Sequence, residues 1–451
     1  MSGKKKDYTL NLSEGPILKN LLLFSLPLIA SSVLQLFFNA ADVVVVGRFA
    51  GDNSLAAVGS TGSIVNLLTN VFMGMSVGAN VLVARYFAAK QEVEVRKTVH
   101  TAITISVISG VILAIIGIVA AKQLLIWMQS PVEVIELSAL YLRIYFLGMP
   151  AILLYNFGAA ILRGVGDTKR PLYYLSFAGV VNVVLNLIFV VFLHMDVAGV
   201  ALATILSQVI SATLVIRCLM REESCIRLER QYLGIDKNTF LRILQIGLPA
   251  GVQGSLFSLS NVVIQSSVNS FGAVVVAGNS AASNIEGFIY VAMNAFSQAM
   301  VAFVSQNLGA GKYERINKGV ITAILSVLVT GGVLGNVVYL LGESLLGLYS
   351  DSAVVIEAGM NRLAIICTTY AICGLMDTMV GALRGLGCSI MPMIVSLLGA
   401  CAFRMAWIFV FFQIERFHTI GTVYYAYPIS WTLTFVVHTI CFVLVRKKIK
   451  K

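Results

Sequence analysis

The sequence has few charged residues for its length. Only 12% of the 451 residues are Asp, Glu, Lys or Arg, whereas 58% are hydrophobic. A soluble domain carries roughly 25% charged residues, so this chain lacks the polar groups that would cover a surface in water. The apolar residues form long runs and not the short alternating segments of an outer-membrane barrel. Because backbone polar groups in lipid must be bonded internally, the composition predicts an all-α integral membrane protein.

Residues suited to catalysis or metal binding are also scarce. The four histidines are scattered, and the sequence contains no HExxH or GxSxG motif. The seven cysteines form no CxxC pair, so we expect free thiols with no redox or metal role. An integral membrane enzyme is therefore disfavoured, and no cofactor is expected.

The two halves of the chain resemble each other. The segment LRGVGDTKRP at 162–171 returns as LRGLGCSIMP at 383–392, a shift of 221 residues. The same shift carries Val134-Ile135-Glu136 onto Val355-Ile356-Glu357, and a shift of 222 carries Leu26-Pro27 onto Leu248-Pro249. An ordered series of matches across both halves indicates an internal duplication, which predicts two lobes.

Each half contains six apolar runs of the length that crosses a bilayer, about 20 residues. We expect an N-lobe at 1–220 with helices 1–6, a cytoplasmic linker at 221–239, and a C-lobe at 240–451 with helices 7–12. The first run is too long for the apolar core of a signal peptide. The expected spans are 17–46, 55–83, 96–121, 137–161, 171–193, 197–219, 240–269, 279–306, 318–341, 353–382, 390–413 and 420–445.

The basic residues predict the orientation of these spans. Most of the 32 lysines and arginines fall in the N-terminal segment, the linker, the C-terminal tail and the loops that follow helices 2, 4, 8 and 10. Because basic loops stay in the cytoplasm, both termini are expected there, in the inner or plasma membrane. The bias accounts for the net charge of +11, so we expect no nucleic-acid partner.

Six spans per half make the two repeats parallel. Parallel repeats are related by an axis along the membrane normal, and such halves enclose a central site and rock around it. The sequence thus predicts a transporter that works by alternating access, which we expect to act as a monomer.

Polar residues within the apolar runs are candidates for function, since ionisable groups in a membrane are expensive. Asp42 ends the first run, where it is either a functional carboxylate or an interface group facing water. Asn182 and Asn186 are four residues apart and share a helix face. Each neutral side chain could instead make an ordinary interhelical hydrogen bond. The further polar candidates in the first half are Gln35, Asn156 and Thr204.

The opening run, GPILKNLLLFSLPLIASSVLQLFFNAADVVVVGRFAG, resembles the first helix of the MATE multidrug and toxic compound extrusion transporters of the MOP superfamily. The resemblance extends along the chain through LRGxGD after the fourth span, N-x-x-x-N in the fifth and a proline opening the seventh. It implies two six-helix bundles and a cation-coupled antiporter that exports amphipathic, often cationic, organic compounds.

The resemblance also implies roles for particular residues. Asp42 would bind the coupling cation, a proton or sodium, with Asn182, Thr204 and Gln35 beside it. Asn186 departs from the family, whose members often carry Asp there. In the second half the family's helix 7 glutamate is missing, and its helix 10 aspartate lies one turn before Asp377.

The remaining candidates concern the substrate and the motion. Asp377 is the repeat counterpart of Asn156, and Glu286 could attract a cation or simply be solvated. Met75 and Met293 could line an adaptable drug cavity, although methionines in a core are commoner. Pro27 and Pro249 each remove a helix hydrogen bond, which permits either a hinge or a static bend.

Two alternatives to drug export remain. A lipid-linked oligosaccharide flippase of the same superfamily would need a basic central cavity, whereas the basic residues here gather at the cytoplasmic edge. An integral membrane enzyme would need a catalytic cluster. Transport of a small organic molecule across the bilayer is the function that the sequence favours.

Overall fold

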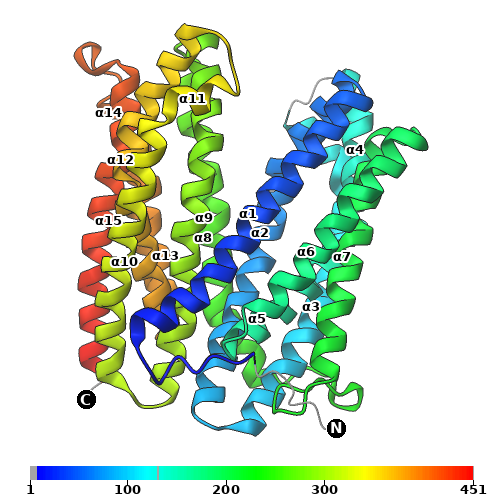
Figure 1. The fold of residues 1–451 in the computed structure, drawn as a ribbon, viewed down its shortest axis with the longest axis vertical. Helices are drawn as coiled ribbons and strands as arrows, with labels where there is room; N and C mark the ends of the chain where they lie inside the picture. Colours follow the sequence, from blue (N-terminus) through cyan, green and yellow to red (C-terminus); the bar gives the residue numbers. More distant parts are fainter. Residues whose placement is uncertain (1–7, 129–131, 450–451) are drawn as a thin grey trace. The chain divides into compact units, whose positions relative to one another are not determined.

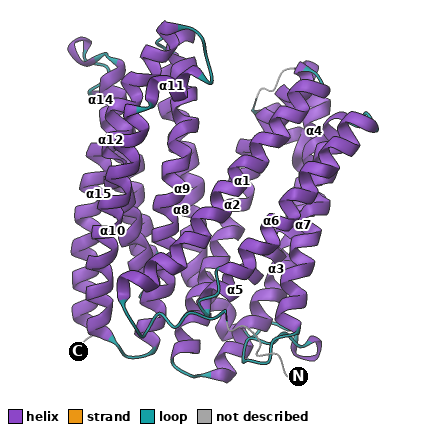
Figure 2. Ribbon diagram, viewed as in Figure 1, coloured by secondary structure: helices purple, strands orange, loops and turns teal. Residues whose placement is uncertain are grey.

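The computed structural model describes residues 8–128 and 132–449, and these residues are helical with no strand (Figure 2). The basic residues at 4–6 and 450–451, which contributed to the predicted orientation, lie outside the described ranges. Two compact units are present. The N unit comprises Ala30–Gly251 with the chain up to Asn11, and the C unit comprises Leu12–Ile29 and Val252–Lys451.

The N unit contains the helices of the first half (Figure 1). Within it, α3 packs against α2, α4 and α5, and α7 packs against α4, α5 and α6. Its helices are α1 (Ile17–Phe49, shared with the C unit), α2 (Asp52–Ala88), α3 (Glu92–Trp127), α4 (Val132–Leu147), α5 (Met149–Gly164), α6 (Lys169–Asn186), the π-helix η1 (Leu187–Phe192), α7 (Asp196–Met220) and η2 (Arg230–Tyr232).

The C unit is organised around α12, which packs against α9, α10 and α15. Its apolar core includes the fully buried Met293 and Tyr424. The helices are α8 (Lys237–Asn269, shared with the N unit), α9 (Ala273–Gly309), α10 (Tyr313–Leu340), α11 (Gly342–Gly347), α12 (Ala353–Gly385), α13 (Ile390–Ser396), the π-helix η3 (Leu397–Ala402), α14 (Phe403–Val410), η4 (Glu415–Phe417) and α15 (Ile420–Ile449).

The predicted twelve-helix layout fits this fold. Within the described residues, 10 helical segments are long and apolar enough to cross a membrane, and the bent pair α4–α5 makes an eleventh. The remaining long helix, α8, has 33 residues. The chain is thus a multi-pass α-helical membrane protein. The lobe limits at 1–220 and 240–451 stay a prediction.

One predicted span is broken in the structure. The run at 137–161 forms α4 and α5, which meet at Gly148 with a bend of 47°. Pro150 has no backbone N–H to bond the preceding turn. At the shift of 221 its counterpart is Ala371, which lies inside the continuous helix α12. The proline therefore explains why only one copy of the repeat bends here.

The repeated segment at 162–171 builds the turn between α5 and α6. Gly166 has φ +90°, and a side chain there would lie 2.1 Å from the backbone oxygen of Leu10. Asp167 accepts the backbone N–H groups of Lys169 and Arg170, at 3.1 and 3.0 Å, in the first turn of α6. Its carboxylate also pairs with the Arg170 side chain. These contacts give the segment a structural role in the N unit.

Candidate functional site

A polar cluster in the N unit joins α1 to α6. The Nδ2 group of Asn186 donates a hydrogen bond to Oδ1 of Asp42, and also approaches Oδ1 of Asn182 at 3.3 Å. Asn186 is fully buried and Asn182 is 5% exposed, while Asp42 is half-buried. The structure therefore brings together three of the four predicted ion-coupling residues.

Local helix geometry positions these side chains. Helix α1 continues seven residues beyond Asp42 to Phe49, so this carboxylate lies within a helix and not at the end of one. Asn182 and Asn186 face the same side of α6 because they are four residues apart. The π-helix η1 begins directly after Asn186, and π-helical turns are rare and frequently occur at functional sites.

Apolar residues of α1, η1 and α7 pack together next in sequence to the cluster. Val45 and Val46 of α1 pack against Val190 of η1 and Val200 of α7. Tyr141 of α4 packs against the same group and stacks on Tyr145, with ring centroids 5.9 Å apart. Tyr141 was not among the residues predicted from the sequence. The internal repeat offered a signal for it, because at the shift of 221 its counterpart in the second half is Arg362.

The cluster contains a carboxyl group with no fixed cationic partner. Among the residues that the structure describes, Asn186 is the only hydrogen-bond donor to the Asp42 side chain, and no basic side chain forms an ion pair with it. Oδ1 of Asn186 is buried and has no hydrogen-bond partner. Carboxylate and amide oxygens suit a hard cation, and a membrane carboxylate can also take up a proton. The arrangement can hold either ion.

The other first-half candidates lie outside this hydrogen-bonded cluster. The Thr204 hydroxyl donates to the carbonyl of Val200, 3.0 Å away on its own helix. Asn156 Nδ2 donates to Ile152 at 2.8 Å, also within its helix. Gln35 is exposed on α1. No described contact joins these side chains to Asp42, so their roles stay predictions.

Asp377 lies on α12 in the C unit and is half-buried. Its backbone carbonyl accepts a hydrogen bond from the Ser297 hydroxyl at 2.7 Å. Its carboxylate forms no hydrogen bond to any described residue. The predicted role of Asp377 in substrate binding stays a prediction.

Glu286 has a fixed partner. Its two carboxylate oxygens accept Nε and Nη2 of Arg362 at 2.9 and 2.8 Å, and both side chains are buried. Nη1 of Arg362 donates to Oδ1 of Asn279 at 2.8 Å. Such a bidentate pair is a strong, directional contact. The geometry gives Glu286 a structural role in the C unit and does not support the predicted contact with substrate.

The two methionines are part of helix packing. Met293 is fully buried, and its sulfur lies 2.6 Å from the place that a side chain on Gly374 would occupy. Met75 is 5% exposed, with its backbone close against Gly247 of α8. The geometry therefore does not support the prediction that these two side chains line a drug cavity.

The two prolines precede the points where the chain passes from one unit to the other. Pro27 lies inside α1, two residues before the division at Ile29. Pro249 lies inside α8, two residues before the division at Gly251. Both predicted hinge residues thus lie close to a point where the chain passes between units, and their role as hinges stays a prediction.

A pocket of about 500 Å³ lies elsewhere in the N unit, between α3 and the segment after η2. It contains no predicted site residue. Among the described residues, no group of three or more His, Cys, Asp or Glu side chains could hold a metal ion. The pocket is lined by Val93, Arg96, Lys97, His100, Thr101, Tyr232, Gly234, Ile235 and Asp236.

Comparison with known proteins identifies relatives along the whole chain. The MatE family model matches twice, at residues 27–188 and 249–410. The probable multidrug resistance protein YoeA of Bacillus subtilis is 27% identical over 94% of this chain and 92% of its own. The probable multidrug resistance protein NorM of Thermotoga maritima is 26% identical over 90% of this chain and 88% of its own.

A solved structure has the same fold. An outward-facing multidrug resistance MATE transporter of the MOP superfamily superposes with a TM-score of 0.91 at 22% identity, covering 99% of this chain and 100% of the other. The duplicated family match and the shared fold agree with the internal repeat.

Proposed function

The chain belongs to the MatE family of transporters, and on that premise we propose that it exports amphipathic, cationic organic compounds in exchange for protons or sodium ions. Family members are transporters and not enzymes, so the enzyme alternative is excluded. The curated relatives are named as multidrug resistance proteins, which supports a drug-like substrate over a lipid-linked sugar.

The observation that carries the proposed coupling is the Asp42 cluster. A half-buried carboxylate in a membrane helix is expensive unless a cation or proton neutralises it. Among the described residues, the Asp42 side chain is hydrogen-bonded to the neutral amide of Asn186. The oxygen of that amide has no hydrogen-bond partner. The coupling ion supplies the missing positive charge, and its release leaves a charged site that changes the energy of the surrounding helices.

The ion site belongs to only one half of the duplication. At the shift of 222 that relates Pro27 to Pro249, the counterpart of Asp42 is Ile264. The C unit therefore has no second copy of the carboxylate. We assign ion coupling to the N unit and substrate contact to Asp377 in the C unit, with Gln35 and Asn156 as further candidates.

Motion follows from the two prolines. Each lies two residues before the chain passes between units, and each weakens its helix by removing a hydrogen bond. Bending of α1 and α8 would let the units rock while each keeps its own packing. Ion binding can drive this motion only if the two conformations bind the ion differently.

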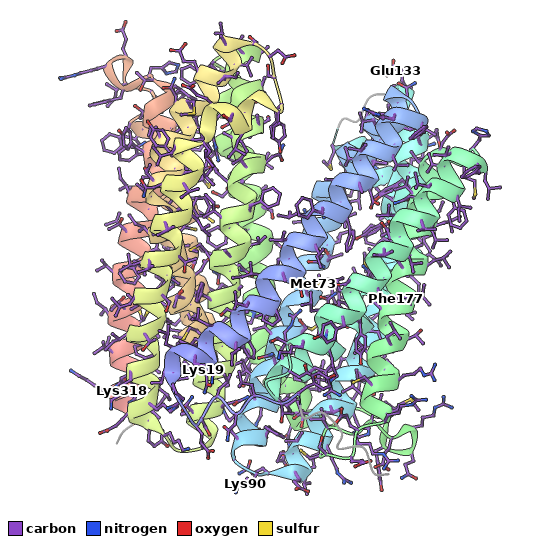
Figure 3. All side chains as sticks on the ribbon, viewed as in Figure 1. Lys19, Met73, Lys90, Glu133, Phe177 and Lys318 are labelled. Atoms are coloured by element: carbon purple, nitrogen blue, oxygen red, sulfur yellow. The ribbon has the colours of Figure 1, made fainter. Side chains whose placement is uncertain are left out.

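The orientation follows from charge within each unit. In the N unit, Lys90 and Glu133 lie at opposite ends (Figure 3). In the C unit, Lys19 and Lys318 lie at the same end (Figure 3), where Arg446 near the C-terminus donates to Asn317 at 3.1 Å. Since basic ends stay in the cytoplasm, we place both termini there in the cell membrane. A monomer is sufficient, because both units come from one chain.

The proposal is tested in inverted membrane vesicles loaded with this protein. A pH gradient and a sodium gradient are imposed separately, and accumulation of a fluorescent organic cation is followed. One of the two gradients should drive accumulation that collapses when that gradient is dissipated. Accumulation that responds to neither gradient would contradict ion-coupled export.

A further inference from the structure

The C unit buries two arginines around one tyrosine ring. Arg362 of α12 is 7% exposed and Arg404 of α14 is 3% exposed. Their guanidinium carbons lie 5.6 and 4.3 Å from the centroid of the Tyr427 ring on α15. The two arginines thus form one cluster with the aromatic side chains of α15.

Arg362 has the partners that a buried guanidinium requires. It uses Nε and Nη2 on Glu286 and Nη1 on Asn279. Asn279 in turn donates to Gln265 at 3.1 Å. Its charge is neutralised by one carboxylate, so Arg362 and Glu286 together are electrically balanced.

Arg404 has no such balance. Its guanidinium forms one hydrogen bond to a described residue, from Nε to the Ser430 hydroxyl at 2.8 Å. Among the described residues, no carboxylate forms an ion pair with Arg404. A guanidinium has five N–H donors, and an unpaired buried charge is strongly unfavourable. Nη1 and Nη2 of Arg404 form no hydrogen bond to a described residue.

The internal repeat places this cluster at the counterpart of the ion site. The two MatE matches begin at 27 and 249 and end at 188 and 410, which is a shift of 222 at both ends, whereas the segments at 162–171 and 383–392 differ by 221. The π-helix η3 follows the second of these segments, and a π-helical turn accommodates one extra residue. Beyond η3 the shift of 222 makes Arg404 the counterpart of Asn182.

The equivalent positions of the two units carry different kinds of side chain. Arg404 corresponds to Asn182, Arg362 to Tyr141, and the apolar Ile264 to Asp42. With Glu286 balancing Arg362, the cluster in the C unit keeps one guanidinium without a carboxylate partner, whereas the cluster in the N unit keeps one carboxyl group without a basic partner. The duplication therefore has polar side chains at corresponding places in both units, of different kinds.

From this geometry we propose that Arg404, with Tyr427 and Trp431, binds the anionic group of an aromatic ligand, a carboxylate or a phosphate. Trp431 lies 5.8 Å from the Arg404 guanidinium and 5.7 Å from the Tyr427 ring, so an aromatic ring can stack beside the captured anion. This assignment rests on the proposed export function and narrows it.

The test uses the purified full-length protein in a neutral detergent and no ion gradient. The probes are 1-pyrenebutyrate and its neutral amide, 1-pyrenebutanamide, and binding is followed by pyrene fluorescence at neutral pH. Because hydrogen bonds to charged groups are the stronger ones, the wild-type protein should bind the carboxylate about tenfold or more tightly than the amide. Equal affinity for the two probes would overturn the proposal without any variant.

Variants test whether Arg404 causes the preference for the carboxylate probe. Arg404→Gln should remove the preference for the carboxylate and leave amide binding unchanged, whereas Arg404→Lys should keep most of it. Arg143→Gln, which removes an exposed arginine of α4, serves as the matched control and should have no effect. If Arg404→Gln fails to fold in size-exclusion chromatography, the wild-type probe pair and Arg404→Lys still decide the question. A folded Arg404→Gln protein that keeps the preference would overturn the proposal.

Competition distinguishes a soluble ligand from a lipid. Displacement of 1-pyrenebutyrate by a soluble aromatic acid such as 2-naphthoate supports an exported compound. Displacement by phosphatidylglycerol in mixed micelles, with 2-naphthoate ineffective, would assign the site to a lipid headgroup and overturn the substrate assignment. This binding assay imposes no ion gradient, so its outcome is independent of the vesicle experiment. Loss of the carboxylate preference with gradient-driven export intact would overturn only the anion site. A carboxylate preference without gradient-driven export would overturn only the proposed ion coupling.

Discussion

Asn186 donates a hydrogen bond to Asp42 across 144 residues of sequence, and this contact fixes α6 against α1 inside the N unit. An amide can hold a carboxylate in either charge state, because it neither titrates nor carries charge of its own. This distinguishes Asp42 from Glu286, which an arginine holds permanently in an ion pair. Substitution of these two acids should therefore have different consequences.

The pair Glu286–Arg362 should contribute to stability. Glu286→Gln would leave the buried Arg362 uncompensated, and breaking a buried pair costs about 3–5 kcal/mol. The double variant Glu286→Gln/Arg362→Met should recover much of this loss, since an apolar replacement leaves no orphan charge. Thermal unfolding of the purified variants measures both effects. A double variant no more stable than Glu286→Gln would contradict the pairing.

Gly166 should tolerate substitution worse than Gly272, although both have φ +90°. A backbone held at this φ costs a non-glycine residue about 1–3 kcal/mol, and both alanine variants incur such a loss. Only at Gly166 would the new Cβ also meet the Leu10 backbone, since nothing lies within 4 Å at Gly272. Gly166→Ala should therefore lower the unfolding temperature more, and equal shifts would contradict the close approach.

Asp236 should make stability depend on pH. Its carboxylate accepts the Thr239 hydroxyl at 2.7 Å and the Thr239 backbone N–H at 2.8 Å at the start of α8, and these bonds hold the pKa of Asp236 below its ordinary value. A lowered folded-state pKa stabilises the protein above the unfolded-state pKa, and the contribution is lost as pH falls through the folded-state value.

Asp236→Ala should accordingly lower the unfolding temperature at neutral pH, and the difference from wild type should narrow as pH falls through the lowered pKa. Asp351→Ala removes an exposed loop carboxylate and provides the control, with no shift expected. If the difference in unfolding temperature between Asp236→Ala and wild type stays constant down to the most acidic pH, the charge of Asp236 does not contribute to stability.

Pro27 should affect the rate of transport more than the affinity for substrate. Pro27→Ala restores a helix hydrogen bond next to the division between units, which stiffens α1 without touching the Asp42 cluster. Pro428→Ala is the matched control, because Pro428 lies inside α15 within the C unit. Transport and equilibrium binding are measured on the same preparations. Normal transport by Pro27→Ala would leave no role for bending at this proline.

The sequence predicted the parts of this fold that depend on local composition and on the repeat. Runs of apolar residues determine where helices cross a membrane, and the spacing of Asn182 and Asn186 places them on one helix face. Those features are visible without knowing which helices touch. The predicted first span, 17–46, already extended past Asp42, and α1 ends three residues later at Phe49.

Features that depend on contacts between helices could not be predicted in the same way. The side chain of Arg362 meets Glu286 across 76 residues, and no periodicity encodes that meeting. A methionine is apolar and flexible at any position, so its type alone does not show whether it is buried. Met293 is buried because Gly331 and Gly374 on neighbouring helices leave room for its sulfur. The break at Gly148 was readable from Pro150, whose effect on the helix is local.

The most direct test of the account is ion movement driven by substrate. Purified protein is reconstituted into proteoliposomes without an imposed ion gradient, a gradient of the transported compound is applied, and proton and sodium movements are recorded with a pH-sensitive dye and a sodium electrode. Wild-type protein, and the control Asp196→Asn at an exposed aspartate of the N unit, should move one of the two ions against the substrate. Asp42→Asn should move neither ion, and an unchanged substrate-driven ion flux in Asp42→Asn would contradict the role of Asp42.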